Sequence, residues 1–214
     1  MAVEVREAKP EDVPFLAWVV LAASRSHLER GVWDLFVEGT EADRLRFLET
    51  LLTSERPHWC HHRGFLVAEG DGRPAAALSG YPADGSELAT PGDAILEAVR
   101  SLGWSDARRA ASFERLGVFL RCLPGDAPDA WIVEWVATRP EFRRRGLVDR
   151  LLAAELDRGR RRGHRTAQIL VLIDNTPAQR AYEKAGFRAV DEKRHPDFEA
   201  ALGSPGLRRL LRPL

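Results

Sequence analysis

The stretch between residues 131 and 173 constrains the fold of this chain more than any other. Its last part, Gln168–Ile173, is a continuous apolar run of strand length, as expected for a strand that is covered on both faces. Ahead of it, Gly146–Gly163 carries leucines at helical spacing, and Trp131–Thr138 has the pattern of a strand that ends before Pro140. Strand, amphipathic helix and buried strand together predict a parallel βαβ unit with a right-handed crossover.

The segments ahead of this unit extend the predicted sheet. Val3–Arg6 alternates like a first strand, and Pro10 opens a helix that is expected to run to about Ala23. A second helix starts at Thr40. Two strands, Gly64–Glu69 and Arg73–Ser79, flank a Gly-Asp-Gly hairpin signal.

Residues 80–129 are different, because their pattern is helical and rich in loops. Asp93 can cap one helix, which Gly103 would close, and Ser105 can cap another that runs toward Phe119. We interpret this part as a helical insertion between two strands of a single domain that covers residues 1–214. Four leucines near residue 214 are expected to form a last strand or an interface, so a homodimer stays open.

Composition limits the partners of the chain. Lysine and arginine number 32, aspartate and glutamate also 32, and the net charge of zero argues against broad attraction to nucleic acid or to an anionic membrane. Two cysteines do not make a disulfide framework, and the apolar run Phe15–Ala23 is too short to span a bilayer. We expect a cytoplasmic protein with no membrane partner and no nucleic-acid partner.

The turn between the strand at 131–138 and the following helix reads Arg143-Arg144-Arg145-Gly146-Leu147-Val148. The first N–H groups of a helix have no partner within it, and the helix dipole places partial positive charge there. The arginines add formal charge, and Gly146 permits close backbone approach. The turn therefore suits a pyrophosphate, although a solvated helix start is the alternative.

A second polar segment, Asn175-Thr176-Pro177-Ala178, follows the buried strand. Thr176 is expected to be an N-cap, with Pro177 at the first helical position and Gln179 completing a capping box. The helix would end at Gly186, and Tyr182 lies one turn before that end. Tyr182 either faces the cleft where the two parallel strands end, where ligands collect in such sheets, or packs against the sheet.

These residues resemble the GNAT superfamily of acyl-CoA-dependent N-acyltransferases. Its signature Arg/Gln-x-x-Gly-x-Gly/Ala is matched by Arg143 and Gly146, with Val148 at the last, usually small position. Its downstream pattern is matched by Asn175, Ala178, Tyr182, Gly186 and Phe187. The resemblance implies an α+β fold: a central mixed, mostly antiparallel sheet with a parallel βαβ pair at the cofactor cleft, flanked by helices.

The resemblance also implies acetyl-CoA as the acyl donor. The backbone of Val136, Ala137 and Thr138 would align the pantetheine arm, and the turn would bind the pyrophosphate through Arg143, Arg144, Arg145, Gly146, Leu147 and Val148. Asn175 would contact the pantetheine or help to place the cofactor. Tyr182 would protonate the leaving thiolate as general acid. The side chain of Val148 could crowd its part of the turn.

Attack on a thioester requires a neutral amine, and therefore a base. On the strand at 131–138, Glu134 would share one face with Ile132, Val136 and Thr138, where burial would raise its pKa into a useful range. A partner for an arginine from another element is the competing role for Glu134. A base that acts through water, or one from the insertion, also stays open.

Other side chains that could carry chemistry are discounted. Neighbouring side chains in Trp59-Cys60-His61-His62 diverge and no second cluster completes a zinc site, so no metal is expected. The run Arg158–Arg165 suits a solvated helix end, with nucleic acid or the adenosine 3′-phosphate of CoA as alternatives. Cys122 has no adjacent base and is not expected to be a nucleophile.

The sequence thus predicts an N-acetyltransferase, an acyltransferase of EC class 2.3.1, that moves an acetyl group directly from acetyl-CoA to a primary amine of a small molecule or peptide. A non-catalytic acyl-CoA-binding regulator is the alternative, and a nucleic-acid-binding module is a third hypothesis, weakened by the zero net charge. No motif identifies the acceptor amine.

Overall fold

Seven strands form one sheet in the order β1-β2-β3-β4-β5-β7-β6. The structure is a computed structural model that describes residues 4–85 and 88–214. Among the described strands, β4 and β5 pair in parallel and the other neighbours are antiparallel, which confirms the predicted mixed sheet. The strands are β1 (Glu4–Glu7), β2 (Phe65–Gly70), β3 (Arg73–Pro82), β4 (Ala130–Thr138), β5 (Thr166–Leu172), β6 (Arg188–Arg194) and β7 (Gly206–Pro213).

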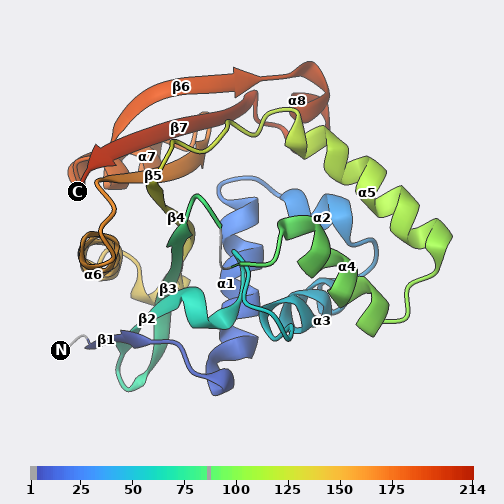
Figure 1. Cartoon of the computed structure of the whole chain (residues 1–214), viewed down its shortest axis with the longest axis horizontal. Coiled ribbons are helices and arrows are strands. Elements are labelled where there is room, and N and C mark those ends of the chain that lie inside the picture. Colours follow the sequence, from blue (N-terminus) through green and yellow to red (C-terminus); the bar gives the residue numbers. More distant parts are fainter. Residues whose placement is uncertain (1–3, 86–87) are drawn as a thin grey trace.

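Helices cover both faces of the sheet (Figure 1). They are α1 (Val13–Arg25), α2 (Val32–Phe36), α3 (Glu41–Leu52), α4 (Pro91–Ser101), α5 (Asp106–Leu120), α6 (Leu147–Arg161), α7 (Thr176–Lys184) and α8 (Pro196–Leu202). The sequence did not predict α2, α8 or β6, and Val3 of the predicted first strand lies outside the described residues. Within residues 4–85 and 88–214, no helix combines the length and the apolar character needed to cross a membrane.

Two predicted helix caps are wrong by a few residues. Thr90, not Asp93, caps α4, because its hydroxyl accepts from the Asp93 N–H at 3.1 Å. Asn175, not Thr176, caps α7, because its side-chain oxygen accepts from the Ala178 N–H at 3.2 Å. In both segments neighbouring residues are able to cap, and the helix start is set by which side chain reaches the free N–H. The cap predicted at Ser105 is confirmed.

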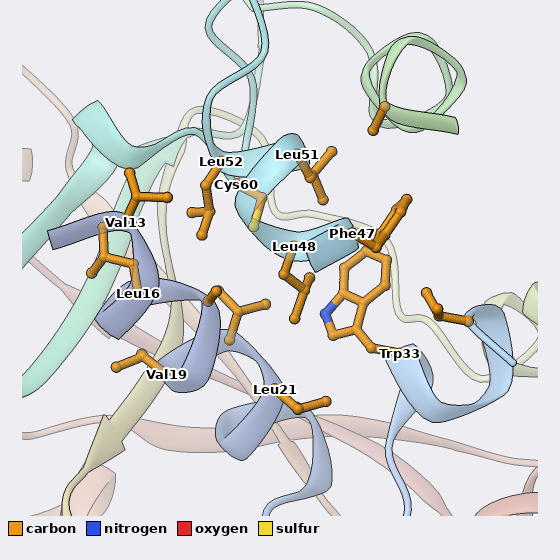
Figure 2. Packing of buried hydrophobic residues seen from close by; sticks show 14 of the residues in the cluster. Val13, Leu16, Val19, Leu21, Trp33, Phe47, Leu48, Leu51, Leu52 and Cys60 are labelled. Atoms are coloured by element: carbon orange, nitrogen blue, oxygen red, sulfur yellow. The ribbon is translucent and has the colours of Figure 1, made fainter. Parts of the chain in front are cut away.

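The larger hydrophobic core lies between the sheet and α1 with α3. Helix α1 is buried around most of its circumference, as expected for a helix enclosed by other elements. Helices α1 and α3 pack against each other, and Figure 2 shows Trp33 of α2 beside Phe47 of α3. The rings of Trp33 and Phe47 have centroids 5.6 Å apart. This core holds α2 against α1 and α3 on the same face of the sheet.

Helix α6 packs closely on the opposite face. Gly159 is an interior helix residue, where glycine costs about 1 kcal/mol relative to alanine. A Cβ atom at Gly159 would lie 2.7 Å from Trp131 Cγ, so the close approach of helix and strand requires the glycine. The indole Nε1 of Trp131 donates to the buried carboxylate of Glu155 at 2.9 Å, which fixes the same contact.

A β-bulge interrupts β4 in its second half. Glu134 pairs with Ser79 and Ala137 with Ala77, so β4 contains one residue more than β3 over this interval. Trp135 takes up the extra residue in the left-handed region, with φ of +53°. The bulge reverses the alternation of side chains: Val136 packs in the cluster on the α6 face, and Ala137 in the cluster on the α1 face. The prediction that Glu134, Val136 and Thr138 share a face is therefore wrong.

The parallel strands β4 and β5 are paired only over their first residues and then separate. Their pairing runs from Ala130 and Thr166 to Val133 and Ile169. Beyond this point β4 pairs with β3 and β5 pairs with β7, while their facing edges diverge. The bulge lies at the place where the strands part, and backbone groups on the free edge of β4 are left available to a ligand.

Candidate active site

A cavity of about 890 Å³ occupies the opening between β4 and β5. Val148 and Tyr182 line it from the face that carries α6 and α7, and Trp33 and Leu116 line it from the face that carries α1. Because residues from the clusters on both faces contribute, the cavity passes through the sheet. Two substrates that enter from opposite faces would meet at the free edge of β4.

Most of the residues predicted for the site do line this cavity. They are Glu134, Val136, Ala137, Thr138, Arg143, Val148, Asn175 and Tyr182. The turn residues Arg144, Arg145, Gly146 and Leu147 do not contribute to its wall. Tyr81 and Asp126 also line the cavity and were missed by the sequence analysis.

The turn ahead of α6 has the backbone shape of an anion site. Arg144 and Gly146 are left-handed, with φ of +61° and +73°, and Gly146 is the N-cap of α6 without a side chain to cap it. The first N–H groups of α6 are therefore available to a ligand. Arg143 extends from the turn along the cavity wall, and its Nε lies 3.5 Å from the Thr138 carbonyl oxygen.

Arg143 and Arg145, two of the three arginines of the turn, have different surroundings. Arg145 lies over the ring of Phe142, 4.9 Å from its centroid, and 3.6 Å from a carboxylate oxygen of Asp71 in the β2–β3 turn. Arg143 alone of the three lines the cavity. The geometry thus distinguishes Arg143 from Arg145 as a neighbour of any ligand in the cavity.

Helix α7 brings Tyr182 to the cavity. The capping bond of Asn175 starts the helix, and the amide of Asn175 also donates to the hydroxyl of Ser26, which follows α1. Tyr182 is 7% exposed, and its ring packs 6.4 Å from that of Phe187. Burial raises the pKa of Tyr182 well above its usual value, so its hydroxyl keeps its proton at neutral pH.

Glu134 lies at the bulge, where its carboxylate enters the cavity. Its Oε2 atom is buried and has no hydrogen-bond partner within the described residues. Burial raises the pKa of Glu134 to about 8, the hydrogen bond with Tyr81 opposes this shift, and the charge of Asp126 adds to it. The charged and polar neighbours that set this pKa include no arginine, so the alternative of an arginine partner for Glu134 finds no support.

Tyr81 and Asp126 come from segments that sequence reasoning could not place. Tyr81 is near the end of β3, opposite Ile132 of β4, and burial raises its pKa far above the usual range. Asp126 lies in the loop before β4 and accepts from the Gln168 amide at 2.6 Å. Only the pairing of β3, β4 and β5 brings these two residues to Glu134.

The histidines at 58–62 make structural contacts. His58 donates through Nε2 to the Leu51 carbonyl at 2.9 Å and accepts through Nδ1 from the Cys60 N–H at 3.1 Å, so both ring nitrogens are occupied. Burial lowers the pKa of His61 to about 4. Within the described part of the chain, no group of three or more potential metal-ligating side chains comes together.

Comparison with known proteins identifies the class. The model of the acetyltransferase (GNAT) family matches residues 31–187. The chain therefore belongs to the GNAT acetyltransferase family, whose members use acetyl-CoA. Curated protein sequences give no significant match.

Solved structures of acetyltransferases share the fold over nearly the whole chain. One described as an acetyltransferase superimposes with a TM-score of 0.70 at 20% identity, covering 98% of both chains. An N-acetyltransferase from Staphylococcus aureus Mu50 gives 0.61 at 18% identity, covering 97% of this chain and 99% of that one. N-acetylglutamate synthase from Neisseria gonorrhoeae, complexed with coenzyme A and N-acetyl-glutamate, gives 0.52 at 15% identity, covering all of this chain and 35% of that one.

Proposed function

We propose that the protein is an N-acetyltransferase that moves an acetyl group directly from acetyl-CoA to the primary amine of a small molecule. One observation carries the proposal: a single cavity through the sheet brings together a carboxylate with a raised pKa and a buried phenol that keeps its proton. Direct transfer to an amine needs one group of each kind, a base for the nucleophile and an acid for the leaving thiolate.

Acetyl-CoA would occupy the part of the cavity nearest α6 and α7. The pyrophosphate would contact the uncapped N-terminus of α6 and Arg143, because both offer donors and positive charge. The pantetheine arm would run along the free edge of β4 at Val136, Ala137 and Thr138, where backbone groups have no partner in β5. Gly146 and Leu147 would contribute backbone N–H groups, together with Arg144 and Val148.

The amine would reach the thioester from the α1 face. Glu134 in its ionised form takes a proton from the ammonium, and the neutral amine then attacks the carbonyl carbon of the thioester. As the carbon–nitrogen bond forms, the carbon–sulfur bond breaks, and Tyr182 gives its proton to the sulfur. The phenolate regains a proton from the nitrogen that has been acylated, so the reaction yields an amide, free CoA and one proton bound at Glu134.

Substitution Tyr182→Phe tests the acid. Because general acid catalysis contributes about 10²–10⁴-fold, kcat should fall by at least about 100-fold, while the KM for acetyl-CoA changes little. The chain has one other tyrosine, Tyr81, which also lines the cavity. Tyr81→Phe is therefore the matched control, and it should keep its maximal kcat at high pH. Full activity of Tyr182→Phe with a good acceptor would remove Tyr182 from the mechanism.

A further inference from the structure

The acceptor end of the cavity has an apolar wall built mainly by α2, α4 and α5. We call it the acceptor chamber and define it by the six residues Trp33, Trp59, Ile95, Phe113, Leu116 and Phe119. Four of the six are aromatic. A ligand that packs against such a wall gains affinity by burying apolar surface, about fourfold for each methylene group.

The chamber is held by contacts that do not involve a ligand. Helix α5 extends from α2 to α8 along one side of the molecule (Figure 1). In the C-terminal half of α5, Arg115 donates to the Leu35 carbonyl at 2.7 Å, and one turn further on the rings of Phe119 and Phe198 have centroids 5.7 Å apart. Arg121 pairs with Asp197 of α8. The apolar wall is therefore fixed before an acceptor binds.

Charged side chains are unevenly distributed over the described lining of the cavity. Among the described residues that line the cavity, the acidic groups are Glu134 and Asp126, and Arg143 is the one lysine or arginine, on the wall reached by the turn ahead of α6. The buried Oε2 of Glu134 has no partner in the described chain, and an ammonium group would supply the donor that it needs. The described lining thus offers a site for a cation at Glu134, with Asp126 near it, beside the apolar wall of the six chamber residues.

We propose that the acceptor is a primary amine with a single positive charge on a compact, uncharged apolar or aromatic body. This inference rests on the proposed function and narrows its substrate class. The two described carboxylates that line the cavity, Glu134 and Asp126, act on each other, so a second ammonium group held among Trp33, Phe113 and the other chamber residues would lose its water against apolar side chains. A substrate carboxylate, as in an amino acid, would lie near Glu134 and Asp126 and be repelled.

A panel of four amines tests the proposal, with free CoA and acetylated product measured together. We expect kcat/KM for 2-phenylethylamine to exceed that for propylamine, for 1,4-diaminobutane and for phenylalanine by at least about tenfold each. Equal turnover of the four, or preference for the diamine or the amino acid, would overturn the inference.

Leu120 allows the chamber to be altered without disturbing the core, because it lines the cavity and is 52% exposed. Leu120→Glu adds a carboxylate at the edge of the chamber. It should lower kcat/KM for 2-phenylethylamine by about tenfold, raise it for 1,4-diaminobutane, and leave the KM for acetyl-CoA unchanged. Val190→Glu is the control, because Val190 is 50% exposed on β6 and does not line the cavity. An identical effect of both substitutions would contradict the assignment of Leu120.

Binding measurements separate failure of the inference from failure of the proposed function. If diaminobutane is acetylated and 2-phenylethylamine neither binds nor reacts, the function stands and the inference is wrong. If 2-phenylethylamine binds to the protein with CoA by calorimetry but no amine is acetylated, the ligand class stands and the function is wrong. Absence of both binding and reaction for 2-phenylethylamine and the other amines would contradict both.

Discussion

At the scale of single residues, burial suits Glu134 to the proposed role of base and Tyr182 to the proposed role of acid. Desolvation disfavours the charged form of each group and raises the pKa of both. For Glu134 the raised value, about 8, makes the carboxylate a base strong enough to take a proton from a bound ammonium. For Tyr182 the shift keeps the proton on the hydroxyl until a thiolate forms beside it.

The pH dependence of the reaction follows from Glu134. The carboxylate accepts a proton only when it is ionised, so kcat/KM for the amine should rise with pH, with a midpoint near its pKa of about 8, and level off above it. Glu134→Gln should lower kcat/KM by about 100-fold or more and abolish this rise. Steady-state kinetics in buffers of constant ionic strength measure both effects.

Tyr81→Phe gives an independent check of the same group. It removes the hydrogen bond that lowers the pKa of Glu134, so the midpoint of the rise in kcat/KM should move to higher pH.

A Glu134→Gln variant that keeps the wild-type rate and pH profile would assign the base to another residue or to water.

The raised pKa of Glu134 should also make the free energy of unfolding depend on pH. The folded pKa of Glu134 lies above its ordinary value of 4.5, so its contribution to stability is complete below about pH 4.5 and is lost as pH rises through about 8. The free energy of unfolding of the wild type, relative to Glu134→Gln, should therefore decrease by on the order of 2 kcal/mol over this range. Urea unfolding of both proteins at the two ends of the range measures the difference, and parallel stability curves would contradict the raised pKa.

At the scale of elements, the turn ahead of α6 and the bulge of β4 form the proposed donor site. The left-handed residues Arg144 and Gly146 orient the backbone toward an anion, and the bulge at Trp135 turns the β4 edge toward the gap between strands. Each is a local departure from regular structure, as is often found at functional sites: the turn lies where the pyrophosphate is proposed to bind, and the bulge where the two substrates would meet.

Arg143 and Arg145 provide a matched pair in this turn. Arg143→Ala should raise the KM for acetyl-CoA by about 10- to 100-fold, because a charge-assisted bond to the pyrophosphate is lost. Arg145→Ala should have little effect, since Arg145 contacts Phe142 and Asp71 instead. With an acetyl-pantetheine thioester, which has no pyrophosphate, both variants should match the wild type. An equal defect of Arg143→Ala with both donors would contradict a pyrophosphate contact.

The βαβ unit was predictable because its signals are local. The leucine spacing of α6 and the apolar run of β5 each identify an element without knowledge of the fold, and Gly146 and Gly163 mark the two ends of α6. The bulge was not predictable in the same way. A tryptophan with positive φ goes against local preference, and the pairing with β3 and the packing of the ring beside Trp33 stabilise it.

At the scale of the whole molecule, the cavity depends on contacts between distant parts of the chain. Tyr81, Asp126 and Glu134 come from three segments that meet only through the sheet, and α5 closes the chamber by spanning α2 and α8. The sequence therefore indicated residues of the proposed donor side, which one βαβ unit builds, and not those of the proposed acceptor side. The segment 80–129 that was expected as an insertion supplies the acceptor wall from α4 and α5.

Direct acetyl transfer from acetyl-CoA to an amine can be tested in one reaction. Purified protein, acetyl-CoA and 2-phenylethylamine are mixed, and free CoA thiol and acetylated amine are quantified in the same sample, by thiol titration and mass spectrometry. With direct transfer, we expect equal amounts of the two products, formed only with the protein present. Tight binding of acetyl-CoA without acetylation of any amine in the panel would contradict it and would favour an acyl-CoA-binding regulator.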